Sequence, residues 1–170
     1  MFDLSGRIAL VTGGGRGIGA EIAMTLARQG AAVVVNDFVP DTAEATVSDV
    51  IAAGGQSIAA PFDVTDYEAC EAEVQRAEAA LGPIDILVNN AGGSPGGMWP
   101  MPFLKTPREK WTDFVDMNLY GVFNCTRAVI GGMAERGWGR IVTVSSDAAR
   151  VGSSGSSIYG AAKAGGEGLM

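Results

Sequence analysis

Short apolar runs alternate along the chain with longer stretches that mix apolar and charged residues. Five runs, most of them rich in Val or Ile, lie at positions 8–11, 32–36, 57–62, 84–89 and 141–145. Runs that are apolar at consecutive positions are typical of strands buried on both faces of a parallel sheet. The pattern therefore predicts five buried parallel strands.

The stretches between these runs are rich in Ala, Glu and Arg and predict helices at about 17–29, 42–53, 67–81 and 108–135. Gly30, Gly54, Gly82 and Gly137 stand just beyond them, where glycine commonly ends a helix. Strands alternating with helices indicate an α/β fold with a doubly wound parallel sheet, Rossmann-like, in a three-layer sandwich. The length of 170 residues fits a single domain over positions 1–170.

A glycine- and proline-rich segment at 92–107 departs from this pattern, and we expect it to lack regular structure. It nevertheless carries the apolar side chains of Met98, Trp99, Met101 and Phe103. Two interpretations remain open for it. It is either a functional loop that meets an apolar ligand, or a surface excursion that packs its own aromatic residues.

Charge and composition exclude several classes of protein. With 12 basic and 19 acidic residues the net charge is −7, so nucleic acid is not expected as a main partner. Histidine is absent, which removes the usual general base and the commonest metal ligand. The only cysteines, Cys70 and Cys125, form no Cys-x-x-Cys pair, so no metal site or disulfide framework is predicted. No signal peptide or membrane span is recognisable either, and a cytoplasmic location is expected.

A glycine-rich turn joins the first predicted strand to the first helix. It reads Thr12-Gly13-Gly14-Gly15-Arg16-Gly17-Ile18-Gly19-Ala20 and contains the pattern G-x-G-x-x-A. Missing β-carbons let backbone N–H groups approach a pyrophosphate, and the helix N-terminus adds partial positive charge. Glycine is common here, at 25 of 170 residues, so the match alone is weak. Its position between strand and helix favours a phosphate-binding turn over a plain connection.

Asp37 ends the second predicted strand, about 20 residues beyond the glycines, where a carboxylate can accept hydrogen bonds from ribose hydroxyls. The same carboxylate repels a 2′-phosphate, which favours NAD over NADP. Arg16 argues the other way, because its guanidinium could meet that phosphate, although it could equally be a solvated loop charge. We expect NAD, with NADP the less favoured cofactor.

With these residues in place, the chain resembles the short-chain dehydrogenase/reductase family from Leu4 to Met170. The family's T-G-x-x-x-G-x-G turn, adenine-contacting Asp-Val pair and N-N-A-G motif are matched by Thr12–Gly19, Asp63–Val64 and Asn89–Gly92. The resemblance implies a cofactor site formed by Gly13, Arg16, Gly17, Ile18, Gly19, Asp37, Asp63, Val64, Asn90, Ala91, Gly92, Tyr159 and Lys163.

The family's catalytic Asn, Ser, Tyr and Lys correspond to Asn118, Ser146, Tyr159 and Lys163. Tyr159 and Lys163 are four residues apart and share a face of a helix, where the ammonium favours the phenolate and makes tyrosine a usable acid and base. By itself the pattern Tyr-x-x-x-Lys often occurs by chance on helices. Ser145 is the alternative to Ser146 as the catalytic serine, and the family spacing favours Ser146.

Asn118 falls inside a predicted helix, where asparagine is a poor former, so by itself it indicates a local kink or an exposed polar residue. The resemblance implies instead that Asn118 holds a water linking Lys163 to solvent.

The resemblance implies an oxidoreductase that transfers a hydride between NAD(H) and a secondary alcohol or ketone. The segment after Ser146 is similar at its start to that of some hydroxyacyl-thioester dehydrogenases, which suggests such a thioester as substrate. A small-molecule substrate and, for a full-length chain, a homo-oligomer are expected. Substrate identity, reaction direction and oligomeric state do not follow from the sequence.

Members of the family continue well beyond the Tyr-x-x-x-Lys motif, whereas this chain ends at Met170. We therefore expect a domain that is incomplete at its C-terminus, with an exposed sheet edge and a short, glycine-rich helix that holds Lys163 poorly. This leaves a second hypothesis, a truncated dinucleotide-binding module with little or no turnover. A non-catalytic structural protein gives no reason for Ser146, Tyr159 and Lys163 to occur together.

Overall fold

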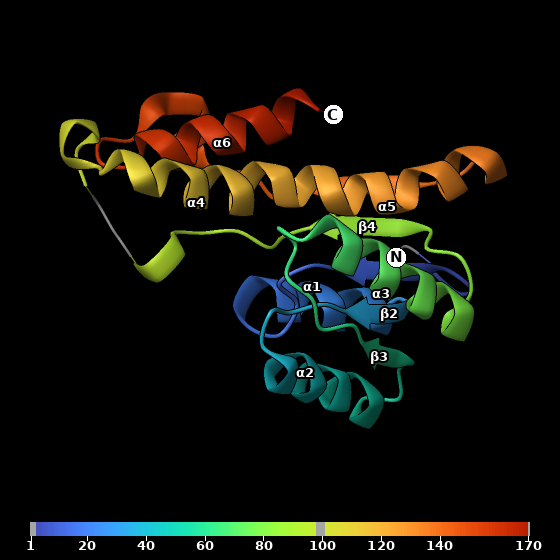
Figure 1. Cartoon of the computed structure of the whole chain (residues 1–170). Coiled ribbons are helices and arrows are strands. Elements are labelled where there is room, and N and C mark those ends of the chain that lie inside the picture. The colour runs from blue at the N-terminus through green and yellow to red at the C-terminus, as the bar shows by residue number, and fades with distance from the viewer. Residues whose placement is uncertain (1–2, 98–100, 170) are drawn as a thin grey trace.

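The computed structural model describes residues 3–97 and 101–169. Its centre is a five-stranded parallel sheet in the order β3-β2-β1-β4-β5 (Figure 1). The strands are β1 (Ile8–Val11), β2 (Ala32–Val35), β3 (Ser57–Ala59), β4 (Ile86–Asn89) and β5 (Arg140–Thr143). The chain builds the sheet outward from β1 to β3, then returns to the other side of β1 for β4 and β5. This order confirms the predicted doubly wound, Rossmann-like sheet.

Helices cover both faces of the sheet. They are α1 (Gly17–Arg28), α2 (Pro40–Ala52), α3 (Tyr67–Leu81), α4 (Trp111–Val115), α5 (Gly121–Arg136) and α6 (Ser157–Gly168). Leu10 and Val34 pack toward α3 and α5, whereas their strand neighbours Val11 and Val33 pack toward α1 and α2. Because successive side chains of a strand point to opposite faces, strands covered on both faces must be apolar at every position.

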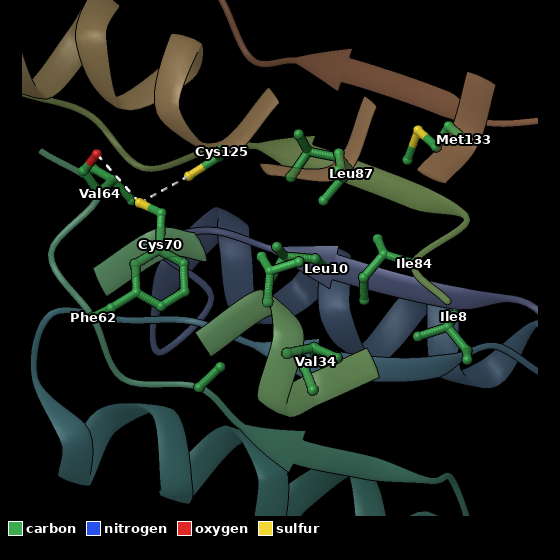
Figure 2. Packing of buried hydrophobic residues seen from close by; sticks show 14 residues of the cluster. Ile8, Leu10, Val34, Phe62, Val64, Cys70, Ile84, Leu87, Cys125 and Met133 are labelled. Carbon is green, nitrogen blue, oxygen red and sulfur yellow. Dashed lines mark hydrogen bonds between the residues drawn. The ribbon is translucent and has the colours of Figure 1, made fainter. Parts of the chain in front are cut away.

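The core between the sheet and the pair α3 and α5 is shown in Figure 2, where Leu10 and Leu87 lie at its centre. Both leucines are buried, with 1% and 0% of their surface exposed. Met133 and Cys125 reach this core from α5. This core packs α5 against the sheet and so fixes the position of α5 beside the site described below.

Four of the five predicted strands are shorter than the apolar runs that indicated them, and the run at 32–36 gives β2 at Ala32–Val35. The run at 57–62 leaves the sheet after Ala59. Beyond this point Asn36 Nδ2 donates hydrogen bonds to the carbonyl oxygens of Ala60 and Phe62, at 3.1 and 3.0 Å. The runs at 84–89 and 141–145 give strands at 86–89 and 140–143. Ala60, Phe62 and Ile84 are buried in the loops beside the strands rather than in the ladder, and hydropathy alone does not distinguish the two.

The predicted helix at 108–135 is continuous but not uniform. A 3-10 turn at Arg108–Lys110 leads into α4, a π-helical segment at Asp116–Tyr120 follows, and α5 then runs to Gly137. Gly137 has a φ of 68°, the left-handed conformation that ends the helix. The π-helical segment contains Asn118, so the helix departs locally from α-helical hydrogen bonding at this residue. Such segments are frequent at functional sites.

The segment 92–107 is not wholly irregular, because its described residues include a 3-10 turn at Phe103–Lys105. A tight turn at Pro95–Gly97 has Gly96 in the left-handed conformation, with a φ of 68°. Single 3-10 turns need few residues, so glycine and proline do not prevent them. The Phe103 ring stacks on Trp111 with 5.3 Å between ring centres. Of the apolar residues noted in the sequence, Met98 and Trp99 lie outside the described residues. The two interpretations of the segment both remain predictions.

β5 is the last strand of the sheet on its side, and Val142 on it is 52% exposed. Beyond β5, α6 packs along α4 and the π-helical segment (Figure 1). The carboxyl end of β5 and the start of α6 therefore lie beside the carboxyl ends of β1 and β4.

Candidate active site

A cleft with a volume of about 610 Å³ lies at the carboxyl ends of β1, β2, β4 and β5. Between β1 and β4 the connections leave the sheet toward opposite faces, and ligands of open α/β sheets bind at this point. Most of the predicted positions line the cleft, namely Gly13, Arg16, Ile18, Gly19, Asp37, Asp63, Val64, Asn90, Ala91, Gly92, Tyr159 and Lys163. Three predicted residues, Gly17, Asn118 and Ser146, lie beside it.

The glycine turn after β1 is shaped by its missing side chains. Gly13 and Gly17 have φ values of 59° and 56°, which glycine adopts without strain. A β-carbon on Gly19 would collide with the Gly13 carbonyl oxygen and lie 2.5 Å from Asn90 Nδ2. That same amide nitrogen donates to the carbonyl groups of Thr12 and Gly13, at 2.9 and 3.0 Å. Asn90 thus ties the turn after β4 to the turn after β1.

The first turn of α1 follows this glycine turn. No side chain of the described residues caps its backbone N–H groups. Arg16 at its N-cap makes no side-chain cap, and the first turn carries no acidic residue. The N–H groups of an uncapped helix N-terminus are available to an anion. Ile18, 70% exposed, lines the cleft at this point. The arrangement fits the pyrophosphate of a dinucleotide.

Asp37 lies at the end of β2 with its carboxylate fixed by two backbone groups. Its Oδ2 accepts a hydrogen bond from the Gly15 N–H and its Oδ1 accepts one from the Val39 N–H, both at 3.1 Å. A β-carbon on Gly15 would lie 2.7 Å from Asp37 Oδ2, so this approach requires glycine. The carboxylate is therefore held where the ribose of an adenosine group would lie.

Asp63 and Val64 follow β3 and line the same end of the cleft as Asp37. Asp63 Oδ1 accepts hydrogen bonds from the backbone N–H and the hydroxyl of Thr65, at 2.9 and 2.8 Å. Phe38, 72% exposed, also lines this end. A planar apolar ring beside polar turns suits a nucleobase.

Asn118 is completely buried and joins the π-helical segment to the turn after β4. Its Oδ1 accepts a hydrogen bond from the Gly93 N–H at 2.8 Å, and its Nδ2 donates to the Gly93 and Phe114 carbonyl groups at 2.9 and 3.0 Å. Asn118 is therefore not the exposed polar residue that its position in a helix allowed. The polar atoms of this buried amide are occupied by backbone groups, as buried polar groups require.

Lys163 is held firmly, contrary to the expectation drawn from the short helix. It is 4% exposed and its Nζ donates a hydrogen bond of 2.9 Å to the Val144 carbonyl oxygen. Burial lowers the pKa of Lys163 below its usual value. A β-carbon on Gly92 would lie 2.8 Å from Asn118 Oδ1 and 2.9 Å from Lys163 Nζ. Gly92 therefore lets the amide and the ammonium approach the same point.

Tyr159 and Lys163 both lie on α6, as the spacing predicted, with Lys163 Nζ 5.9 Å from the centre of the Tyr159 ring. The serine assignment is less direct. Ser145 lines the large cleft and donates a 2.5 Å hydrogen bond to Glu167. Ser146 follows it, and its Oγ accepts a 3.2 Å hydrogen bond from the Ala148 N–H. The role of Ser146 stays a prediction.

The sequence did not indicate several residues that line the cleft, which are Asn36, Phe38, Val39, Phe62, Met117 and Val144. Ser145, the alternative to Ser146, also lines it. Asn36 is the most informative of them, because its Oδ1 accepts a 3.4 Å hydrogen bond from the Gly13 N–H while its Nδ2 holds the segment after β3. A polar residue directly after a Val-rich strand was the available signal.

The buried ammonium of Lys163 leads to a testable effect on stability. Burial disfavours the charged form in the folded state, so wild-type stability should rise as pH rises through the lowered pKa of Lys163 toward the unfolded value of about 10.4. Lys163→Met removes this titration, so its free energy of unfolding relative to that of the wild type should fall by about 1 kcal/mol between pH 7 and pH 10. Urea unfolding at a series of pH values measures it. Parallel stability curves for the two proteins would contradict a buried charge.

Comparisons with known proteins agree with this geometry. The family model for the short chain dehydrogenases matches residues 7–170. The chain is 43% identical over 166 residues to acetoacetyl-CoA reductase of Rhizobium meliloti (strain 1021), covering 96% of this chain and 64% of that protein. It is 42% identical over 165 residues to nodulation protein G of Azospirillum brasilense, covering 95% and 65%. This chain belongs to the short-chain dehydrogenase family.

Solved structures show the same likeness. A 7α-hydroxysteroid dehydrogenase in complex with NADH and 7-oxo glycochenodeoxycholic acid superposes with a TM-score of 0.91 at 36% identity, covering 98% of this chain and 64% of that one. A metagenomic short-chain oxidoreductase in complex with NADP gives 0.90 at 34% identity, covering 98% and 74%. Members of the family with either dinucleotide therefore share this fold.

The chain spans slightly less than two thirds of the length of the two curated relatives named above. No helix of residues 3–97 and 101–169 is long and apolar enough to cross a membrane. Within the same residues no three His, Cys, Asp or Glu side chains gather as metal ligands would.

Proposed function

We propose that this chain binds NAD(H) and acts as an oxidoreductase that moves a hydride between that cofactor and a secondary alcohol or ketone. One observation carries the proposal. A single cleft has Asp37 and Val64 at one end and Tyr159 and Lys163 at the other. A ribose-binding carboxylate and an acid-base pair in one cleft are what a dinucleotide-dependent dehydrogenase requires.

The described residues fit a dinucleotide. The glycine turn and the uncapped α1 suit the pyrophosphate, because backbone N–H groups there can approach an anion closely. The turn keeps this shape only because Gly19 has no β-carbon, which would collide with the Gly13 carbonyl oxygen. Asp37 suits the adenosine ribose, and Gly92 keeps the space between Asn118 and Lys163 open. A bound nicotinamide supplies the site that gives or takes the hydride.

The residues at the other end of the cleft manage the proton. In the oxidation direction Tyr159, as phenolate, accepts the proton of the substrate hydroxyl, and in reduction its phenol returns it. The Lys163 ammonium favours the phenolate and can hold a ribose hydroxyl of the cofactor. Ser146 orients the substrate oxygen. Asn118 Oδ1 accepts one hydrogen bond, from the Gly93 N–H, and its second lone pair holds the water through which Lys163 reaches solvent.

For the substrate we propose a hydroxyacyl or ketoacyl thioester as the first class to test. Two lines of support converge: the segment after Ser146 is similar to that of hydroxyacyl-thioester dehydrogenases, and the chain is similar over most of its length to acetoacetyl-CoA reductase of Rhizobium meliloti. The experiment follows NADH absorbance with acetoacetyl-CoA and with simple ketones. Consumption of NADH with a ketone supports the oxidoreductase. NADH binding without turnover across the panel supports a dinucleotide-binding module instead.

Asp37 should set the preference between the two dinucleotides. Its fixed carboxylate favours NADH and repels the 2′-phosphate of NADPH. Asp37→Ser should therefore shift the ratio of NADPH to NADH affinity by roughly 10- to 100-fold toward NADPH. Fluorescence titration with both cofactors measures this ratio. Asp41→Ser, on the exposed first turn of α2, is the matched control and should leave it unchanged. An unchanged ratio in Asp37→Ser would remove Asp37 from cofactor selection.

A further inference from the structure

The carbonyl group of Val64, at the Asp37 end of the cleft, is contacted by side chains from α3 and α5. Its carbonyl oxygen accepts a 2.9 Å hydrogen bond from Asn124 Nδ2 on α5. The Cys70 thiol on α3 lies 3.6 Å from the same oxygen and 3.8 Å from the Asp63 carbonyl oxygen. Figure 2 shows Cys70 pointing toward Val64 from one side and toward Cys125 from the other. The turn that lines the cleft therefore has a fixed support behind it.

This support is buried and closely packed. Cys70 and Cys125 are 0% and 1% exposed, and their sulfur atoms lie 3.9 Å apart. Burial and the contact with Cys70 raise the pKa of the Cys125 thiol, so it stays protonated. A β-carbon on Gly121 would lie 2.8 Å from Val64 Cγ2, so α5 also approaches the Val64 side chain at van der Waals distance.

We propose that Asn124 and Cys70 are positioning residues that set the affinity for the adenine half of the dinucleotide. The inference rests on the proposed function, because it assumes that the Val64 end of the cleft receives adenine. Neither residue lines the cleft. Each contacts the Val64 carbonyl oxygen. These contacts fix the position of the Asp63–Val64 segment relative to the end of β3.

The effect should be confined to one half of the cofactor. Removing the Asn124 amide leaves the Val64 carbonyl oxygen with only the weak donor of the Cys70 thiol, so the turn gains a strong hydrogen bond by moving toward water. The opposite end of the cleft has separate anchors, because Asn118 binds Gly93 and Lys163 binds the Val144 carbonyl. A shifted Val64 therefore changes adenine contacts and leaves the nicotinamide end in place.

The test compares binding of NADH with binding of reduced nicotinamide mononucleotide, which lacks adenosine, by isothermal titration. Asn124→Leu keeps the size of the side chain and removes the donor. We expect its dissociation constant for NADH to rise roughly five- to thirtyfold and that for the mononucleotide to stay within about twofold. Arg136→Met is the matched control, because Arg136 also anchors α5 to a backbone carbonyl, that of Ile84. It should change neither constant.

The cysteine pair gives a second test, which can be read even if Asn124→Leu is too unstable to measure. Cys70→Ala and Cys125→Ala each remove one buried thiol and the same sulfur contact, but only Cys70 reaches the turn. Cys70→Ala should weaken NADH binding about two- to threefold more than Cys125→Ala. Equal losses for both variants, or equal losses of NADH and mononucleotide in Asn124→Leu, would overturn the positioning role. Wild-type protein that binds no dinucleotide would overturn the proposed function as well.

Discussion

Tyr159→Phe should lower turnover about 1,000-fold while NADH affinity stays within about twofold of the wild-type value. The substitution removes only the hydroxyl that exchanges the proton with substrate. The Phe ring keeps the packing of Tyr159 on α6, and Lys163 keeps its hydrogen bond to the Val144 carbonyl group. Steady-state rates and NADH titration of the same preparation separate the two quantities.

Tyr120→Phe is the matched control for this experiment. Tyr120 is 52% exposed, and its ring packs edge-on against Phe123 at 5.9 Å, a contact that phenylalanine can keep. Its turnover should equal that of the wild type. Turnover in Tyr159→Phe within tenfold of the control would assign the acid-base role to another group.

Gly19→Ala should abolish detectable dinucleotide binding and lower the free energy of unfolding by about 2 to 3 kcal/mol. The added methyl group collides with the backbone carbonyl of Gly13 and displaces Asn90, which joins the turns after β1 and β4. Overpacking of this kind typically costs about 1–3 kcal/mol. Urea unfolding and NADH titration measure the two effects.

Gly131→Ala tests the same substitution where space is open. Gly131 lies inside α5, and a β-carbon there meets no atom of the described residues within 4 Å. Alanine is the better helix former by about 1 kcal/mol, so this variant should be slightly more stable and bind NADH normally. Comparable losses in both variants would show that the Gly19 effect is not steric.

The sheet was predictable from sequence because its physical cause is local. Strands covered on both faces must be apolar at consecutive positions, and α1, α2, α3 and α5 each end near a glycine with positive φ, namely Gly30, Gly54, Gly82 and Gly137. Strand ends were less predictable. Phe62 is buried in the loop after β3 rather than in a strand, and its carbonyl oxygen accepts a hydrogen bond from the Asn36 side chain. Hydropathy does not distinguish these two kinds of burial.

The site was predictable as far as residue type and spacing define it. The glycine turn, Asp37 and the Tyr159–Lys163 pair follow from such rules and from the family resemblance. The contribution of Asn124 does not, because a half-buried asparagine on a helix gives no signal until the tertiary structure brings it to the Val64 carbonyl. The firm hold on Lys163 was likewise missed, since it depends on a carbonyl group beyond β5.

The central claim is direct hydride transfer within this cleft, and labelled NADH tests it most directly. The protein is incubated with NADH carrying deuterium at both C4 positions and with a panel of ketones and ketoacyl thioesters, and the alcohol product is analysed by mass spectrometry. Direct hydride transfer predicts one deuterium at the carbinol carbon, and loss of this product in Tyr159→Phe. Saturating NADH binding with no labelled alcohol from any substrate would contradict it.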